Sequence, residues 1–588
     1  MKEFTRIIFA TITGMLITGF ICLILCVAVI TSLIASSDTE TSVRNNSIFV
    51  LNIEGNLAER YTPDPIDQLL GEEITTYGLE DILNSIQKAQ YNDNIKGIYL
   101  NIKYCDYPPA SLKAIRNALQ RFRQTGKFII AYGGNYSQGG YYLASIANKV
   151  IVNPSGHITW HGLSAQTMFF TELLQKTGIK MQIFRVGTYK SAIEPFTHTE
   201  MSEANRRQTQ AYIQSLWDEL VTDIASSRNL PIKHIELLAD KNMTFETAQS
   251  YVSNGLADTL MYNDEVLTYL KTLVGCKKSD ELATLTLDDM IHVSSPHKTV
   301  NSSNEIAIYY AYGEIDNGLG YNGEGINSEQ MAQDLRKLRE DEDVKAVVLR
   351  INSPGGSAYG AEQIWREVSL LKAKKPVVVS MGDYAASGGY YIASPANYII
   401  ASPTTLTGSI GIFGMFPDAS ELLNDKLGLH WDGVKTNRFA DMGTLYKPLS
   451  EEEKDLIQKT VNEGYKLFTQ RCAEGRNMPL EELEKIAEGR VWTGKMAKEL
   501  NLVDALGDLD TAIAYAAKLS HSSSYHTKAY PQEEDLFSIF LKKRTDRYIN
   551  KKIGNWIGYE YFDALSWLKN AQQNDFMQAR LPFNLYIH

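Results

Sequence analysis

The sequence predicts an α/β protein made of two tandem repeats, because one series of segments occurs twice at a constant spacing. The run Asn92–Ile102 (NDNIKGIYLNI) matches Asp341–Ile351 (DEDVKAVVLRI), and Ala147–Pro154 matches Ala396–Pro403, each 249 residues further on, as from 92 to 341. In both copies, short β-branched runs alternate with amphipathic stretches. That alternation is typical of parallel sheets covered by helices.

Three pairs of buried strands are predicted along the two repeats. Each is a short β-branched or aromatic run bounded by Gly or Pro, as expected of a strand buried on both faces. In chain order the pairs are SIFVLNI (47–53) with EIAIYYA (305–311), GIYLNI (97–102) with AVVLRI (346–351), and KFIIAYG (127–133) with KPVVVSMG (375–382). Amphipathic stretches between them, such as residues 361–372, predict helices that pack on the sheets.

The chain is expected to divide into five parts, since 588 residues exceed one core. They are an N-terminal segment with an anchor (1–36), a first repeat (46–275), a polar linker (276–304), a second repeat (305–520) and a C-terminal tail (521–588). The tail has no partner in the first half. We expect it to be a helical cap over exposed core, with an interaction tail as the alternative.

The N-terminus predicts a membrane helix. Residues 7–35 contain no charged side chain, and this stretch is longer than the roughly 20 residues needed to cross a bilayer. It is also longer than the apolar core of a cleaved signal peptide. Lys2 and Arg6 precede it, so the positive-inside tendency places the N-terminus in the cytoplasm. We therefore expect a single-pass protein of the cytoplasmic (inner) membrane, with most of the chain on the periplasmic side.

Composition argues against two classes of function. The net charge of -11 comes without a basic run, so a nucleic-acid partner is not expected. Outside the anchor, Cys105, Cys276 and Cys472 have no paired spacing, and the His residues form no HExxH motif. We accordingly expect neither a metal site nor a cofactor.

One distinctive turn occurs in both repeats with a single informative difference. The stretch AASGGYYIAS (385–394) matches YSQGGYYLAS (136–145), but Ser387 is replaced by Gln138 in the earlier copy. Ser387 follows a predicted strand and opens a helical pattern, where backbone N–H groups and the helix dipole favour developing negative charge. The same position also suits a helix N-cap, so the turn alone leaves both roles open.

A second stretch and a lysine favour catalysis. The second repeat has Pro-Gly-Gly at 354–356, whose backbone N–H groups can hold an oxyanion, and the first repeat lacks it. A serine nucleophile needs a base, and no His occupies a matching place in the halves. Aligning FRVGTYKSAIEPF with the later repeat puts Lys190 opposite Arg438. Lysine can lose its proton when desolvated, whereas arginine cannot. An exposed surface ion pair is the alternative for Lys190.

Together these motifs resemble a known family. NSPGG (352–356), residues 381–414 and residues 184–196 are similar to signal peptide peptidase A of the long, two-repeat, membrane-anchored type, in peptidase family S49. The resemblance covers nearly the whole chain after the anchor. It implies two tandem ClpP/crotonase-like repeats and the activity of a serine protease.

The resemblance also implies roles for six residues. These are Ser387 as nucleophile, Lys190 as general base, Ser409 as the group that orients the lysine amine, and Gly388 with Gly355 or Gly356 as oxyanion-hole donors. The first repeat would then supply the base and the second the nucleophile. Whether they meet within one chain or between two is left open.

The implied substrates are peptides, specifically remnant signal peptides cleaved outside the cytoplasmic membrane. The resemblance further implies a homo-oligomer, with a tetramer as the expected assembly. Two other classes stay open on the residues alone: a crotonase-like acyl-CoA enzyme, whose fold also aims paired glycine N–H groups at a carbonyl, and a non-catalytic membrane scaffold.

Overall fold

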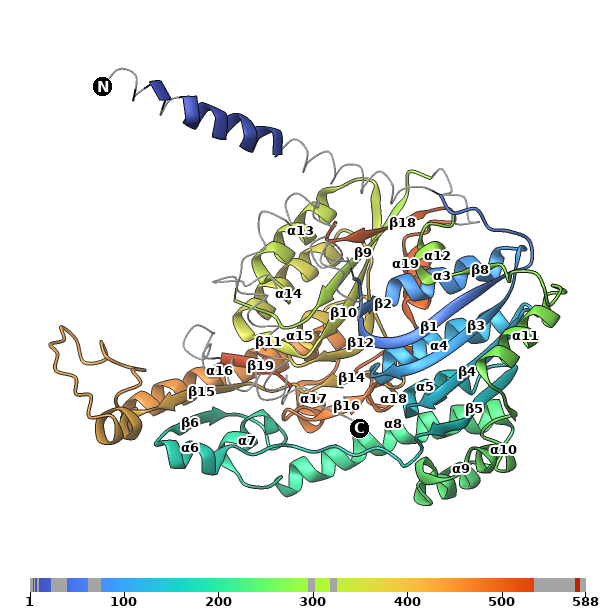
Figure 1. Ribbon diagram of the computed structural model, residues 1–588. Helices are drawn as coiled ribbons and strands as arrows, with labels where there is room; N and C mark the ends of the chain where they lie inside the picture. Colours follow the sequence, from blue (N-terminus) through green and yellow to red (C-terminus); the bar gives the residue numbers. More distant parts are fainter. Residues whose placement is uncertain are drawn as a thin grey trace.

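The computed structural model contains two α/β halves that lie against each other (Figure 1). It describes residues 4, 6–7, 10–22, 40–61, 76–294, 302–317, 325–532 and 577–581 of the 588-residue chain. Each half has its own predominantly parallel sheet, and a third, smaller sheet combines strands from both halves.

The first half is built on a parallel sheet in the order β2-β1-β3-β4-β5-β7, with β8 added beside β1. Ile98 of β3 pairs with Phe49 on one side and Ile129 on the other, and all three side chains are buried. Its strands are β1 (Ser47–Ala58), β2 (Thr76–Gly78), β3 (Ile95–Cys105), β4 (Phe128–Tyr136), β5 (Lys149–Ile158), β7 (Thr259–Leu260) and β8 (Thr284–Leu285).

The second half repeats this order, since β9-β10-β12-β13-β17 correspond to β1-β3-β4-β5-β7. β14 extends β12, β16 pairs antiparallel with β14, and β18 lies beside β9. The strands are β9 (Glu305–Tyr312), β10 (Val344–Ser353), β12 (Val377–Ala386), β13 (Tyr398–Ala401), β14 (Leu406–Gly408), β16 (Val491–Thr493), β17 (Ala505–Leu506) and β18 (His526–Tyr530). The predicted α/β class, the repeat and the three strand pairs are confirmed.

Helices cover both faces of each sheet, so each half has apolar side chains on either side of its sheet. The first half contains α3 (Leu79–Tyr91), α4 (Pro109–Gln124), α5 (Gln138–Ala144), α6 (Thr171–Thr177), α7 (Glu194–Thr197), α8 (Glu203–Arg228), α9 (Ile232–Asp240), α10 (Ala248–Ser253), α11 (Asn263–Leu273) and α12 (Leu287–Ile291). The second contains α13 (Ser328–Glu340), α14 (Ala358–Lys372), α15 (Gly388–Ala393), α16 (Glu451–Arg476), α17 (Leu480–Ile486), α18 (Gly494–Glu499) and α19 (Leu509–Leu519).

The two halves interlock through the third sheet. Its order is β11-β19-β15-β6, with β6 (Lys180–Arg185) from the first half and β11 (Gly355–Ser357), β15 (Phe413–Asp418) and β19 (Met577–Arg580) from later in the chain. β6 pairs antiparallel with β15 over its whole length. The long helix α8 of the first half also contacts β16 of the second. Segments of the first half are thereby held against the second.

The predicted linker and the predicted C-terminal tail differ from what the structure describes. The described residues of the predicted linker are not all irregular, because β8 pairs with β1 and α12 packs on α3. The described parts of the predicted helical tail are strands, β18 and β19, because each pairs with a strand edge. Residues 533–576 and 582–588 of that tail lie outside the described ranges.

The predicted membrane anchor, residues 7–35, is described only in part, since residues 8–9 and 23–35 lie outside the described ranges. Among the residues that the structure does describe, no helix has the length and apolar character needed to cross a membrane.

Candidate active site

Ser387 stands in a strained turn between β12 and α15. Its backbone has φ 54° and ψ −114°, a conformation that residues other than glycine seldom adopt. The turn is held because the Ser387 N–H donates to the carbonyl oxygen of Gly408 at 2.7 Å. Ser387 occupies the N-cap position of α15, yet within the described chain its hydroxyl makes no capping hydrogen bond. The cap alternative therefore does not account for this side chain.

The Ser387 hydroxyl instead contacts Lys190. The Lys190 Nζ lies 2.7 Å from Ser387 Oγ, and 3.1 Å from both the Oγ and the carbonyl oxygen of Ser409. All three residues are completely buried. Lys190 is thus not the exposed surface residue of the alternative interpretation. The structure brings the predicted base, nucleophile and orienting serine together, within one chain.

Burial sets the protonation state of Lys190. Removing the ammonium from water disfavours its charged form, so burial lowers the pKa of Lys190 well below the ordinary lysine value. The positive charge of Arg580 lowers this pKa further. A neutral amine 2.7 Å from a hydroxyl can accept its proton.

The loop that carries Lys190 is fixed by residues that the sequence did not single out. A Cβ on Gly489 would lie 2.7 Å from the Cβ of Lys190, so only glycine allows this close approach. The Tyr189 N–H donates to the carbonyl oxygen of Glu488 at 2.9 Å. The Gln208 side chain of α8 donates to the Tyr189 carbonyl and accepts from the Val491 N–H, at 3.0 and 3.2 Å. The lysine is thereby positioned by contacts from both halves.

The predicted oxyanion residues lie together beside Ser387. Gly355 and Gly356 have φ values of 105° and 153°, which glycine adopts without strain. A Cβ built on Gly388 would lie 3.3 Å from the Gly356 nitrogen, and one built on Gly355 would lie 2.8 Å from the Gly388 nitrogen. The backbone nitrogens of Gly356 and Gly388 therefore lie close to each other, whereas the Gly355 N–H donates to Ser353 Oγ at 3.2 Å.

A buried polar cluster joins the halves behind these loops. Arg350 of β10 donates to both carboxylate oxygens of Glu59, at 2.9 and 3.0 Å. Asn352 donates to Glu59 at 2.9 Å and to Asp383 at 3.3 Å. Ser111, in the first turn of α4, donates its N–H and hydroxyl to Asp383 at 2.8 and 2.6 Å. Burial raises the pKa of Asp383. These bonds tie β10 and β12, which lead to the Gly355–Gly356 loop and to Ser387, to the first half.

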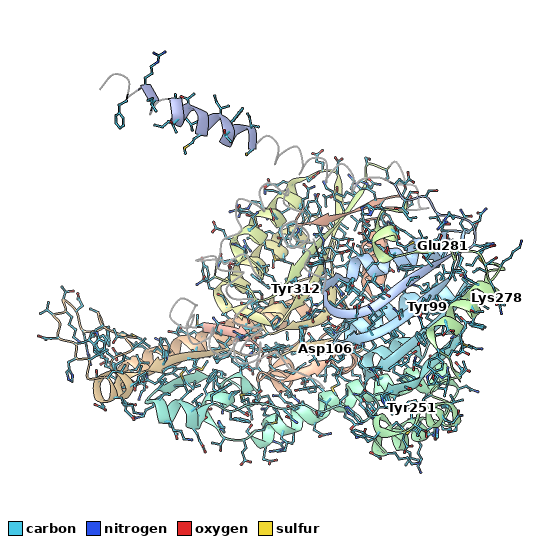
Figure 2. The ribbon with its side chains drawn as sticks, in the orientation of Figure 1. Tyr99, Asp106, Tyr251, Lys278, Glu281 and Tyr312 are labelled. Carbon is cyan, nitrogen blue, oxygen red and sulfur yellow. The ribbon has the colours of Figure 1, made fainter. Side chains whose placement is uncertain are left out.

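The equivalent positions of the first repeat are arranged differently. Gln138 is buried, and its amide bonds to the backbone of Gly162 and His161. Where the second repeat has Gly355, the first has Asp106, which directly follows β3 and is exposed (Figure 2). Arg438, the predicted counterpart of Lys190, is exposed and pairs with Glu452. The first repeat thus has neither a hydroxyl at the position equivalent to Ser387 nor a buried base from Arg438.

The chain is similar to several known proteins. The model of "Peptidase family S49" matches residues 121–277 and 369–523. "Protease 4" of Salmonella typhi is 38% identical over 81% of this chain and 78% of that protein, and "Protease 4" of Haemophilus influenzae is 36% identical over 85% and 83%. "Serine protease SPPA, chloroplastic" of Arabidopsis thaliana is 32% identical over 81% and 69%. A solved ClpP1 structure from Listeria monocytogenes matches 36% of this chain and 95% of its own at 16% identity, with a TM-score of 0.24.

Proposed function

The chain belongs to peptidase family S49 and is a serine protease, and we propose that it hydrolyses peptide bonds with a Ser387–Lys190 dyad. The observation that carries the proposal is the 2.7 Å distance between Lys190 Nζ and Ser387 Oγ in a fully buried site. A crotonase-like acyl-CoA enzyme would not need this pair, and a scaffold would not need a strained serine. The family assignment and the pair both favour the protease.

The mechanism follows from the neutral amine of Lys190 beside Ser387 and from the nearby glycine N–H groups. Neutral Lys190 accepts the Ser387 proton as Oγ attacks the carbonyl carbon of the scissile bond. The N–H groups of Gly356 and Gly388 donate to the oxyanion that forms. The C–N bond then breaks, Lys190 returns the proton to the leaving amine, and water hydrolyses the acyl-enzyme by the same proton path. Ser409, 3.1 Å from Nζ, holds the amine toward Ser387.

The substrates we propose are peptides released at a membrane, including remnant signal peptides. The uncharged stretch of residues 7–35 supports a single-pass anchor in the cytoplasmic membrane, with the catalytic halves on its outer side. Extraction of membranes at alkaline pH tests this anchor: the full chain should stay in the pellet, and a chain beginning after residue 36 should be released. Release of the full chain would contradict the anchor.

A homo-oligomer is the proposed assembly, and one exposed segment supports it. The arm, residues 427–439, extends beyond β15 and η3 (Glu421–Lys426) in Figure 1. It exposes five large apolar side chains: Leu427, Leu429, Trp431, Val434 and Phe439. In the repeat alignment the arm is the counterpart of β6, the strand that joins the two halves. A second copy of the chain is the proposed partner of the arm, since the equivalent segment already mediates contact between repeats.

The test of this assembly is light scattering on two matched variants. Val434→Asp should shift the chain toward the monomer because it places a charge on the arm. Leu237→Asp, on the exposed face of α9, is the control and should leave the mass unchanged. An unaltered mass for Val434→Asp would remove the arm from the assembly.

The dyad is tested by the pH dependence of activity. Because the pKa of Lys190 is lowered, the amine is neutral above that depressed value and protonated below it. Peptide hydrolysis and labelling of Ser387 by a serine-directed phosphonate should therefore fall together as pH decreases through this pKa, and should be retained above it. A flat profile with intact fold would contradict a lysine base.

A further inference from the structure

The strand β12 changes its neighbour shortly before Ser387. As far as Ser380 it pairs with β13, and from Tyr384 onward it pairs with β14 (Figure 1). The Ser387 N–H then donates to Gly408, the last residue of β14, and Ser409 follows directly. The position of the nucleophile beside Ser409 therefore depends on where β12 leaves β13 and joins β14.

A β-bulge lies at this point, on the edge that β12 shares with β10. The pairing of the two strands is regular as far as Ile351 and resumes at Ser353. Between these positions β10 has one residue, Asn352, whereas β12 has three, residues 382–384. Bulges are frequent next to active sites, where they redirect the side chains that follow. This bulge redirects the end of β12, which leads to Ser387.

The Asn352 side chain holds the bulge from within the sheet. Its Oδ1 accepts the Tyr384 N–H at 3.0 Å, and its Nδ2 donates to Glu59 at 2.9 Å and to Asp383 at 3.3 Å. Gly382 allows this close packing, because a Cβ there would lie 2.8 Å from the Asn352 Cβ and from Glu59 Oε1. One amide thus fixes both the backbone and the carboxylate of the bulged segment.

Two residues of the first half hold the bulge from the other side. Glu59, directly after β1, accepts from Asn352, and Ser111 of α4 donates its N–H and hydroxyl to Asp383 at 2.8 and 2.6 Å. We call Asn352, Asp383, Glu59 and Ser111 the bulge cluster. Its members are at most 8% exposed. They are therefore too deeply buried to bind a peptide, and they can affect the reaction only through the bulge.

The first repeat lacks the bulge cluster. At the repeat spacing of 249 residues, Asn352 corresponds to Lys103 and Asp383 corresponds to Gly134. Lys103 is exposed and pairs with Glu54, and Gly134 is exposed as well. The fold of a repeat can therefore form without this amide and this carboxylate. They are present in the repeat that carries the nucleophile.

We propose that the bulge cluster positions the nucleophile. By fixing the path of β12, it places Ser387 Oγ within reach of Lys190. Because β10 continues from Asn352 into the Gly355–Gly356 loop, the same amide also sets the distance between that loop and Ser387. The inference rests on the proposed Ser387–Lys190 function. The first half then contributes to the geometry of the nucleophile as well as supplying the base.

Kinetics of two matched serine variants test the inference. Ser111→Ala removes the hydroxyl that bonds to Asp383. Ser215→Ala, the control, removes a buried hydroxyl on α8 that shares a hydrogen bond with Thr493 of the second half. Ser111→Ala should lower kcat about 10-fold with KM nearly unchanged, because small displacements of reacting groups reduce the rate and the cluster does not bind the peptide. Ser215→Ala should keep the wild-type kcat.

Asn352→Asp should have a larger effect. The new carboxylate keeps an acceptor for the Tyr384 N–H but faces the carboxylates of Asp383 and Glu59, so kcat should fall about 100-fold or more. A serine-directed phosphonate separates positioning from folding. The rate of labelling should fall with kcat in both variants, whereas the final extent, which counts folded sites, should stay at the wild-type level in Ser111→Ala.

Three results would overturn the inference. The first is a wild-type kcat in Ser111→Ala, or in an Asn352→Asp chain that is folded. The second is a loss of activity in Ser111→Ala that only matches a loss of labelled sites, and the third is an equal fall of kcat in Ser215→Ala. A wild-type chain that neither hydrolyses the peptide nor is labelled would instead overturn the proposed function on which the inference rests.

Discussion

The two strand-to-helix turns share the sequence Gly-Gly-Tyr-Tyr, and each helix has a serine at its N-cap, but the two serines lie one position apart in the repeat alignment and act in opposite ways. In the first half, Ser137 has φ −65° and ψ 163°, and its Oγ accepts the Gly140 N–H at 3.1 Å, as an ordinary N-cap does. In the second, Ser387 has φ 54° and its Oγ lies 2.7 Å from Lys190. A cap stabilises by about 1 kcal/mol, and a strained backbone costs on the order of 1–3 kcal/mol. The turn in the second half is therefore less stable locally, and its strained backbone directs the Ser387 hydroxyl toward Lys190.

The first half fills the same place with a structural amide. The Gln138 Oε1 accepts the N–H groups of His161 and Gly162 at 3.1 and 3.0 Å, and its Nε2 donates to the Gly162 carbonyl at 2.9 Å. These bonds satisfy backbone N–H and carbonyl groups of the loop at His161 and Gly162. The comparison teaches that one repeat kept the fold and supplies Lys190 on the loop that follows β6, while the other keeps the strained turn and the Gly355–Gly356 pair.

The largest effect should come from removing the two serines in turn. Ser387→Ala should reduce peptide hydrolysis by a factor of about 10⁴ or more, since nucleophile and base act as a unit. Ser137→Ala should leave hydrolysis almost unchanged and lower the free energy of unfolding by about 1 kcal/mol, the usual value of a cap. Steady-state kinetics and denaturant unfolding of both variants check this. Equal losses of activity would break the distinction between the turns.

The second effect concerns the two cations at equivalent positions in the repeat alignment. Lys190→Arg should lower hydrolysis by about 10²-fold or more, because a guanidinium stays protonated and cannot serve as base. Arg438→Lys, the reciprocal change on the exposed arm, should have little effect on kcat. The measurement is kcat/KM for both variants, with circular dichroism to show that each is folded. An active Lys190→Arg chain would remove the base assignment.

The smallest effect is expected for Gln138→Ser on the Ser387→Ala background. The new hydroxyl would lack a buried base, since Arg438 is exposed, and would lack the glycine pair, since Asp106 stands there. Neither phosphonate labelling at residue 138 nor peptide hydrolysis should appear. Labelling with measurable turnover would show that the first half is itself a competent site, and the comparison would fail.

Much of the fold was predictable because it depends on local pattern. Val377–Val379 and the other β-branched runs are buried on both faces, so their strands follow from composition, and the constant spacing gives the repeat. The strand β19 was not predictable. The four residues MQAR include no β-branched or aromatic side chain, and their pairing depends on Gly355 and Phe413, both far away in the chain.

The residues of the site likewise divide into those that the sequence predicts and those that only the folded structure shows. Ser387 and the glycine pair stand out because they differ between two otherwise similar repeats. Gln208 and Gly489 do not, because what they do is set by contacts made only in the folded protein: Gln208 bonds across to Val491, and Gly489 leaves room for Lys190. The burial that lowers the pKa of Lys190 also depends on packing between the halves. No single stretch of sequence encodes it.

The central claim is that both halves of one chain build a single site. It is tested most directly by mixing the inactive Ser387→Ala and Lys190→Ala chains, by co-expression as well as after purification. Because Nζ and Oγ lie 2.7 Å apart within the same chain, each variant lacks one half of every dyad. We predict that peptide hydrolysis stays at the level of the separate variants at every mixing ratio. Hydrolysis that rises above both would show that Lys190 of one chain serves Ser387 of another, and would contradict the account.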